Sequence, residues 1–167
     1  MGEDEQVENR DLIQVSAELG IAGSDVVFAT NPGAAADVTM TDQIDSRGPI
    51  CIVDDDVWVC DSLSVLLETY GFAVLTYASG AEFLKDDRRL KAKCLIIDQH
   101  MPGLNGLDVV GELHRHGVVL PAILITGRLD PGITQRAGEL GVCAILEKPF
   151  PVARLVELIG SALVARD

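Results

Sequence analysis

Residues 94–106 read CLIIDQHMPGLNG, a short apolar run that is followed by an acid and a loop. Its first four residues form an unbroken apolar run, which is typical of a strand buried on both faces in a parallel sheet. The run ends at Asp98, and a loop marked by Pro102 and Gly103 follows. Because ligands of open α/β sheets bind beyond the carboxyl ends of the strands, Asp98 is predicted at the edge where chemistry takes place. Taken alone, Asp98 could equally be an acid that ends a strand and caps a turn.

On both sides of this stretch, short apolar runs alternate with amphipathic segments. The runs predict strands at 50–54, 73–77, 94–97, 120–126 and 142–147. The segments predict helices at 57–70, from 79, at 105–116, 131–140 and 152–164, with a charged loop at 86–93. In the first helix the expected buried face is Val59, Leu63, Leu66, Leu67 and Tyr70. Five strand-then-helix units, each short enough for one right-handed crossover, predict a single doubly wound α/β domain.

Charge divides the chain into two parts. Residues 1–48 carry ten acids and two arginines, a net charge of −8, whereas residues 49–167 carry sixteen acids and eleven bases, a net charge of −5. The first part is therefore predicted to be an acidic, mostly disordered extension, with a weak helix over Val7–Ile21 as the alternative. The second part, 49–167, is predicted to be the folded domain.

The overall composition excludes several classes of protein. A net charge of −13 argues against direct binding to nucleic acid and against docking on an anionic membrane. No run of apolar residues is long enough to span a bilayer, and the acidic start is unlike a secretory signal. The four cysteines include no Cys-x-x-Cys pair, which favours small core residues in a reducing cytoplasm over a zinc site or a redox switch.

Polar residues follow four of the predicted strands at the point where each ends. They are Asp54, Asp55 and Asp56 after the first strand, Asp98 after the third, Thr126 after the fourth and Lys148 after the fifth. Each residue has an ordinary structural explanation, since aspartates cap helices, Thr ends strands and Lys is usually solvated. Because parallel strands end at the same edge of a sheet, these residues are expected to gather there.

Such a cluster of carboxylates requires a cation or a proton, because neighbouring negative charges repel strongly in a partly buried site. Mg²⁺, which prefers carboxylate and water oxygens, is the expected ion. Mg²⁺ together with a fixed Lys and a hydroxyl donor suits phosphoryl transfer, in which the equatorial oxygens must be held and neutralised. An aspartate can act as the nucleophile and form an acyl phosphate.

The motifs VDDD (53–56), DQHMPG (98–103), TG (126–127) and EKPF (147–150) together resemble the receiver domain of two-component response regulators, in the CheY-like superfamily. Their spacing agrees, with 43 positions from Asp55 to Asp98, 28 to Thr126 and 22 to Lys148. The residues of the last two motifs, TG and EKPF, are similar to those of the nitrogen-fixation and nodulation branch of the family. The resemblance extends over about residues 49–166. Four motifs in this order are far more specific than any one of them.

The resemblance implies a role for each residue and a flavodoxin-like (βα)5 fold with strand order 2-1-3-4-5. It implies that Asp98 is the phosphoacceptor, that Lys148 pairs with aspartate or phosphoryl oxygens and that Thr126 hydrogen-bonds the phosphoryl group. For Mg²⁺ it implies the ligands Asp54, Asp55, Asp98 and the backbone carbonyl of His100. It also implies a cis Lys148–Pro149 bond, and Mg²⁺-dependent phosphorylation and dephosphorylation catalysed by the domain itself.

One departure from the family pattern concerns switching. The strand position three residues before the lysine usually carries Tyr or Phe, and here it is Ile145. The coupling of phosphorylation to the surface formed by 131–140, 142–147 and 152–164 is therefore predicted to be altered or weak. His100 and Arg128 lie two positions after Asp98 and Thr126 and are expected to tune the lifetime of the phosphoryl group.

The leading hypothesis is a cytoplasmic receiver without an output domain. It would accept a phosphoryl group from a histidine kinase or histidine phosphotransfer protein, then contact a downstream protein or act as a phosphate sink. A homodimer through the surface of 131–140, 142–147 and 152–164 is part of this hypothesis. The first alternative is a non-switching interaction module, and the second is the C-terminal receiver of a hybrid sensor kinase.

Overall fold

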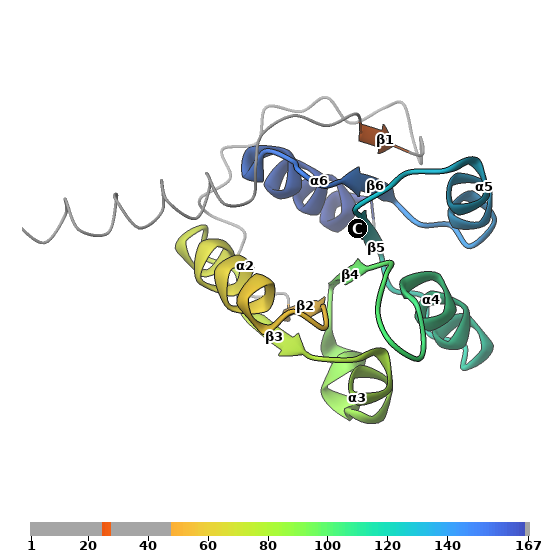
Figure 1. Ribbon diagram of the computed structural model, residues 1–167. Helices are drawn as coiled ribbons and strands as arrows, with labels where there is room; N and C mark the ends of the chain where they lie inside the picture. The colour runs from red at the N-terminus through yellow and green to blue at the C-terminus, as the bar shows by residue number, and fades with distance from the viewer. Residues whose placement is uncertain (1–24, 28–47, 166–167) are drawn as a thin grey trace, which may run out of the picture.

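A computed structural model describes residues 25–27 and 48–165 of the chain. Five parallel strands form the sheet (Figure 1): β2 (Ile50–Val53), β3 (Val74–Tyr77), β4 (Cys94–Asp98), β5 (Ala122–Thr126) and β6 (Ala144–Glu147). A sixth strand, β1 (Asp25–Val27), pairs antiparallel with β6. The order across the sheet is β1-β6-β5-β4-β2-β3. Counted along the chain, the five parallel strands have the order 2-1-3-4-5, so the predicted flavodoxin-like topology is confirmed.

Helices cover both faces of the sheet (Figure 1). They are α2 (Val57–Thr69), α3 (Gly80–Lys85), α4 (Gly106–Arg115), α5 (Pro131–Glu139) and α6 (Val152–Val164), with a short 3₁₀ helix, η2 (Asp87–Lys91). Most buried residues of α2 and α6 belong to one hydrophobic cluster, and the buried apolar residues of α3, α4 and α5 belong to the other. None of the helices in the described part of the chain is long and apolar enough to cross a membrane.

The apolar runs of β2, β4 and β5 are fully buried because side chains of a strand alternate between the two faces and both faces are covered. In β4, Cys94 and Ile96 contribute to the cluster under α2 and α6. Leu95 and Ile97, the residues between and after them, contribute to the opposite cluster. This period of two explains why the sequence shows an unbroken run rather than an apolar–polar alternation.

Capping residues fix where the helices begin relative to the strand ends. Asp56 Oδ1 accepts a hydrogen bond from the N–H of Trp58 at 3.0 Å, which starts α2 immediately after the aspartates that follow β2. Asn105 and Asp108 form a reciprocal capping box at the start of α4. Asp130 Oδ1 accepts from the N–H of Ile133 at 2.9 Å at the start of α5. These caps hold the connecting loops short and in place at one edge of the sheet.

Three details differ from the sequence-based expectations. Tyr70 is 45% exposed, because it is the C-cap residue of α2 rather than part of its buried face. Part of the predicted charged loop is the 3₁₀ helix η2. Asp25–Val27 form a strand inside the extension that was expected to be disordered or weakly helical. The remainder of 1–48, including the helix predicted over Val7–Ile21, lies outside the described residues.

Gly106 is expected to be intolerant of any side chain. A Cβ atom there would lie 2.7 Å from the carbonyl oxygen of Asp98 and 2.8 Å from Leu124 Cδ1. Gly106→Ala should therefore lower the free energy of unfolding by about 1–3 kcal/mol, since the backbone beside Asp98 must move. Urea denaturation measures this change.

Gly111 in the same helix supplies the control, because a Cβ there would meet nothing within 4 Å. Gly111→Ala is expected to raise the free energy of unfolding by about 0.5–1 kcal/mol through helix propensity. Equal effects of the two substitutions would show that the close approach of α4 to β4 is not as described.

Candidate functional site

Three carboxylates meet where β2 and β4 end. Val53 of β2 lies in register with Ile97 of β4, so the residues that follow the two strands are neighbours. Asp54 and Asp98 are 3% and 6% exposed, and Asp55 is exposed. Each of the three offers one oxygen atom, and these atoms lie within 4.8 Å of one another. The structure thus brings together the three aspartates for which the sequence predicted a shared site.

Lys148 enters this cluster from the end of β6. Its Nζ lies 3.1 Å from Asp98 Oδ1 and 3.6 Å from Asp54 Oδ2. Burial lowers the pKa of Lys148, but the charges of Asp54 and Asp98 and the hydrogen bonds to them outweigh this effect and raise it above its usual value. The ammonium group therefore stays charged between two buried carboxylates. The Lys148–Pro149 peptide bond is cis, as the family resemblance implied.

Asp54 is the carboxylate that burial affects most clearly. Desolvation raises its pKa, and the hydrogen bond from the Asp56 N–H at 2.9 Å and the charge of Lys148 offset this only in part. The negative charges of Asp98 and Asp55 raise it further. Holding Asp54 ionised in the absence of a metal ion therefore costs the fold free energy, which a bound cation would return.

Asp54→Asn is expected to stabilise the metal-free protein at about pH 7, by about 0.5–2 kcal/mol. A folded-state pKa above the unfolded value means that wild-type stability is lost as pH rises through the folded pKa. The variant lacks this loss, so the difference between the two proteins should disappear in acid. Urea denaturation at several pH values in EDTA measures it.

Asp87→Asn is the control, since the Asp87 side chain is 94% exposed. It removes one carboxylate from the same acidic protein without touching the cluster. A variant Asp54→Asn that is less stable than wild type at neutral pH would contradict the account of this residue.

The loop after β4 holds Asp98 in place through its own backbone. Asp98 Oδ2 accepts a hydrogen bond from the N–H of His100 at 3.0 Å, while Oδ1 faces Lys148. The N–H of Gln99 donates to the carbonyl of Ile125 at 2.7 Å, which extends the pairing of β4 with β5 by one residue. Both oxygens of Asp98 are thus oriented before any ligand binds. His100 lies in the loop from which its carbonyl was predicted to reach a metal ion.

Thr126 is completely buried at the end of β5, and its hydroxyl is used locally. Thr126 Oγ1 donates to the carbonyl of Arg128 at 2.8 Å and accepts from the Arg128 N–H at 3.2 Å. His100 Nδ1 lies 3.5 Å from the same oxygen. To donate to a phosphoryl oxygen, Thr126 must give up the bond to the Arg128 carbonyl. This structure therefore has the hydroxyl turned toward its own loop.

Two polar residues beside the site were not singled out from the sequence. Glu147 Oε1 accepts a hydrogen bond from the N–H of Leu129 at 3.0 Å, which ties the residue before Lys148 to the loop after Thr126. Gln99 Oε1 accepts from the N–H of Leu107 at 3.1 Å, which ties the residue after Asp98 to α4. Both residues lie inside the quoted motifs DQHMPG and EKPF, but their partners are backbone groups that no sequence pattern marks.

The donor set fits a hard divalent cation such as Mg²⁺. Asp54, Asp55 and Asp98 supply carboxylate oxygens at close range, and the exposed Asp55 leaves one side of the cluster open to water. Mg²⁺ in proteins keeps several waters and takes one or two carboxylates. Neither Cys nor His side chains contribute to this cluster, so a zinc site of the usual type does not fit it.

Ile145 is fully buried in the middle of β6. It belongs to the cluster that contains Leu124 and the core residues of α4 and α5. An aliphatic side chain in this position fills the core and has no ring that could turn from the surface to the interior. The departure noted in the sequence therefore changes the core where β6 pairs with β5, since Ile145 lies in register with Leu124.

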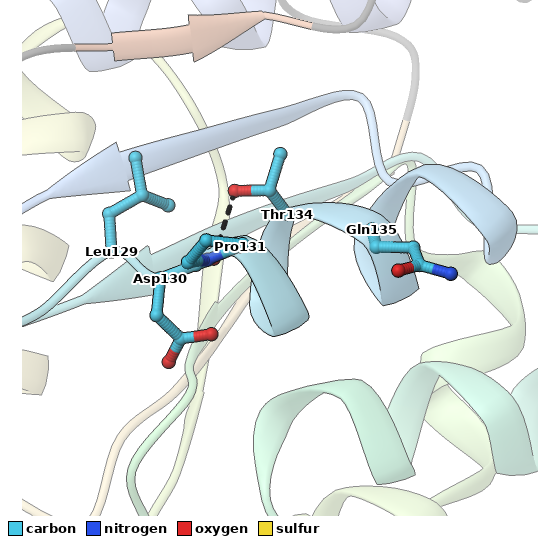
Figure 2. A pocket seen from close by; sticks show the side chains of 5 residues that line it. All are labelled: Leu129, Asp130, Pro131, Thr134 and Gln135. Atoms are coloured by element: carbon cyan, nitrogen blue, oxygen red, sulfur yellow. Dashed lines mark hydrogen bonds between the residues drawn. The ribbon is translucent and has the colours of Figure 1, made fainter.

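A separate open groove lies at the start of α5, on the loop that follows Thr126 (Figure 2). It has a volume of about 480 Å³ and is lined by Leu129, Asp130, Pro131, Thr134 and Gln135. Thr134 Oγ1 donates to the carbonyl of Asp130 at 3.1 Å. None of the carboxylates of the cluster lines this groove, so the two are distinct.

Comparison with known proteins gives a consistent result. Residues 50–160 match the model of the response regulator receiver domain family. The transcriptional regulatory protein FixJ of Azorhizobium caulinodans is 36% identical over 115 residues, which cover 69% of this chain and 54% of that protein. Response regulator protein TmoT of Ectopseudomonas mendocina is 36% identical over 132 residues, covering 79% of this chain and 59% of that protein. Nodulation protein W of Bradyrhizobium diazoefficiens is 33% identical, and the match covers 70% of this chain and 52% of that protein.

Solved structures agree with these relatives. The response regulator StyR superposes with a TM-score of 0.65 at 33% identity, over 71% of this chain and 60% of that one. The chemotaxis protein CheY4 of Vibrio cholerae has the same TM-score at 24% identity and is covered completely, which supports the fold alone. The chain spans little more than half the length of the curated relatives that it matches.

Proposed function

This chain belongs to the response regulator receiver domain family of bacterial two-component systems, and from that premise we propose that Asp98 is its phosphoacceptor. The observation that supports this most strongly is the contact of Lys148 Nζ with Asp98 Oδ1 at 3.1 Å, beside Asp54 and Asp55. A buried carboxylate with an oriented oxygen, an adjacent fixed ammonium group and two further acids is the arrangement that phosphoryl transfer to an aspartate needs. The donor would be a histidine kinase or a histidine phosphotransfer protein.

The chemistry is an in-line displacement at phosphorus. An oxygen of Asp98 forms the new bond to phosphorus, the bond between phosphorus and the donor's imidazole nitrogen breaks, and the electron pair leaves with that nitrogen. The product on Asp98 is an acyl phosphate. Mg²⁺, when bound, would neutralise charge on the transferring phosphoryl oxygens. Asp54 and Asp55 would hold the ion, with the carbonyl of His100 as a further ligand.

Lys148 and Thr126 act on the phosphoryl group once it is attached. Lys148 already lies beside Asp98 and would move its contact from the carboxylate to a phosphoryl oxygen. Thr126 would exchange its bond to the Arg128 carbonyl for one to the phosphoryl group. This exchange changes the loop that leads into α5, so it is the step by which phosphorylation would reach the surface.

The test is intact-protein mass spectrometry after incubation with acetyl phosphate. We expect wild type to gain one phosphoryl group in the presence of Mg²⁺ and none in EDTA, and Asp98→Ala to gain none in either buffer. Asp56→Asn is a matched control that removes a neighbouring acid from the same loop and keeps a good helix cap. Absence of any gain in folded wild type with Mg²⁺ would overturn the proposal.

A non-switching interaction module is the second candidate, and one observation favours it. Ile145 is buried where the family usually has an aromatic residue, so the movement of Thr126 has no ring to accompany it. In that case Asp98 would still accept a phosphoryl group, but partner binding would not change. Partner affinity measured with and without a phosphoryl analogue on Asp98 separates the two candidates.

The remaining parts of the proposal concern the cell and the assembly. We place the domain in the cytoplasm, where its phosphodonor would act. Its downstream target would be a protein, and a homodimer through the surface of α5, β6 and α6 is the self-association that we propose. Because the chain matches only part of its relatives, the receiver of a hybrid sensor kinase stays an alternative for the longer context.

A further inference from the structure

The outer edge of β6 is a surface that binds an extended strand. In the order β1-β6-β5-β4-β2-β3, β6 would be the edge strand of the parallel sheet if β1 were absent. Such an edge presents backbone N–H and C=O groups that can pair with another chain. Here Asp25, Val26 and Val27 pair antiparallel with Leu146, Ile145 and Ala144. Figure 1 shows β1, in red-brown, alongside β6 at that end of the sheet.

We propose that β1 is an intramolecular cap that excludes a second copy of this chain from the edge of β6. The pairing shows that the edge accepts a strand in the antiparallel direction. Two identical β6 edges can meet in the antiparallel direction by a two-fold rotation, which is the commonest symmetry of homodimers. Since one edge cannot pair with two strands, β1 and the second copy compete. This inference rests on the proposed function in one respect, because the excluded partner is the second copy of the proposed homodimer.

The cap is short and tethered, which are the properties of an exchangeable strand. Only three residues of β1 pair with β6. Twenty residues, 28–47, separate it from Gly48 at the start of the folded domain. Because β1 and β6 belong to one chain, their pairing is intramolecular, and a second molecule must compete with it. A short pairing also opens more readily than the core strands do.

The capped edge and the phosphoryl site share one strand. Asp25 pairs with Leu146, and Lys148 follows two residues later with its Nζ 3.1 Å from Asp98. Glu147, between them, accepts the hydrogen bond from Leu129 in the loop after Thr126. A change at one end of β6 could therefore reach the other end through the strand itself.

The test uses the full chain with the double substitution Val26→Pro and Val27→Pro. Successive N–H groups of a strand point in opposite directions, so one of the two prolines removes an N–H that faces β6 whichever register of hydrogen bonds holds. The matched control, Val26→Thr with Val27→Thr, keeps β-branched side chains and both N–H groups. Neither variant changes the net charge, so repulsion between the acidic extensions is the same in both.

Two measurements decide the proposal. Hydrogen exchange of a peptide covering 142–147 should be faster in the proline variant than in the threonine variant and wild type, with the peptide covering β4 unchanged as proof of folding. Sedimentation equilibrium without any phosphodonor should give a dimer dissociation constant about tenfold lower for the proline variant. A tenfold change corresponds to about 1.4 kcal/mol of competition from the three-residue pairing.

Unchanged exchange of β6 would overturn the cap. Faster exchange with the chain still monomeric at every concentration, or with irregular aggregates in place of a dimer, would overturn the excluded second copy. Mass gain from acetyl phosphate, measured on the same three proteins, keeps the two proposals apart. If none of the three proteins is phosphorylated, but the hydrogen exchange of β6 and the dimer dissociation constant change as expected, the proposed function fails and the cap stands.

Discussion

Replacing Asp55 with asparagine is expected to weaken Mg²⁺ binding by about 100-fold or more. Loss of a residue that merely supports a metal ligand lowers affinity by about 10–100-fold, and Asp55 is proposed to be a ligand. It is the exposed member of the three carboxylates, so it offers its oxygen without the desolvation that raises the pKa of Asp54. Because the proposed phosphorylation of Asp98 would use the ion, the rate with acetyl phosphate should fall with it.

Trp58 provides the measurement, since it is the single Trp of the chain, is 81% exposed and lies three residues after Asp55. Its fluorescence should change during a Mg²⁺ titration of wild type and should need at least about 100-fold more Mg²⁺ in Asp55→Asn. Asp56→Asn, one position along, should titrate nearly as wild type does. If the two asparagine variants bind Mg²⁺ equally, Asp55 is not a ligand.

Replacing Lys148 with glutamine is expected to slow phosphorylation by acetyl phosphate about 100- to 1000-fold. Removal of one positioned donor to a developing negative charge typically has an effect of this size. Lys148 lies between Asp54 and Asp98 at 3.6 and 3.1 Å, so its loss also leaves two buried carboxylates without their cation. The thermal midpoint of the metal-free variant should therefore fall, and Mg²⁺ should restore more stability to it than to wild type.

Lys85→Gln removes the same charge from an exposed position in α3 and is the matched control. It should leave the phosphorylation rate unchanged, which separates the local role of Lys148 from the effect of net charge. Rates measured by intact mass at several times give both results. A Lys148→Gln protein that is phosphorylated as fast as Lys85→Gln would remove Lys148 from the mechanism.

Much of the site could be predicted because its residues follow buried apolar runs. The run Cys94–Ile97 predicts a strand, and parallel packing then places Asp98 at the same edge of the sheet as the residues that follow the other strands. The strand order came from the family resemblance, since periodicity does not determine which strands are neighbours. The structure confirms the topology and brings the aspartates and Lys148 together.

Other features could not be predicted because they depend on partners far along the chain. Asp25–Val27 has no periodic pattern of its own and becomes a strand only against β6. Tyr70 fits the apolar face of α2 by spacing, yet the helix ends there and the ring remains 45% exposed. The hydrogen bond from the Leu129 N–H to Glu147 joins a backbone donor to a side chain, which no residue pattern marks.

Ile145 raises the main question about switching in this domain, because the family usually has an aromatic residue at this position. Its full burial shows that the core is complete without an aromatic ring at this position. Thr126 nevertheless keeps an alternative partner, the carbonyl of Arg128, from which it can be released. Switching in this domain would thus depend on the loop after Thr126 and its bond to Glu147 rather than on a rotating ring.

Identifying the residue that carries the phosphoryl group decides between Asp98 and its neighbouring aspartates. Borohydride reduces an acyl phosphate to an alcohol, so a phosphorylated Asp98 becomes homoserine, which peptide mass spectrometry locates. After treatment with acetyl phosphate and Mg²⁺, the account predicts homoserine at position 98 and at no other aspartate. Homoserine at Asp54 or Asp55 with Asp98 unmodified would contradict it.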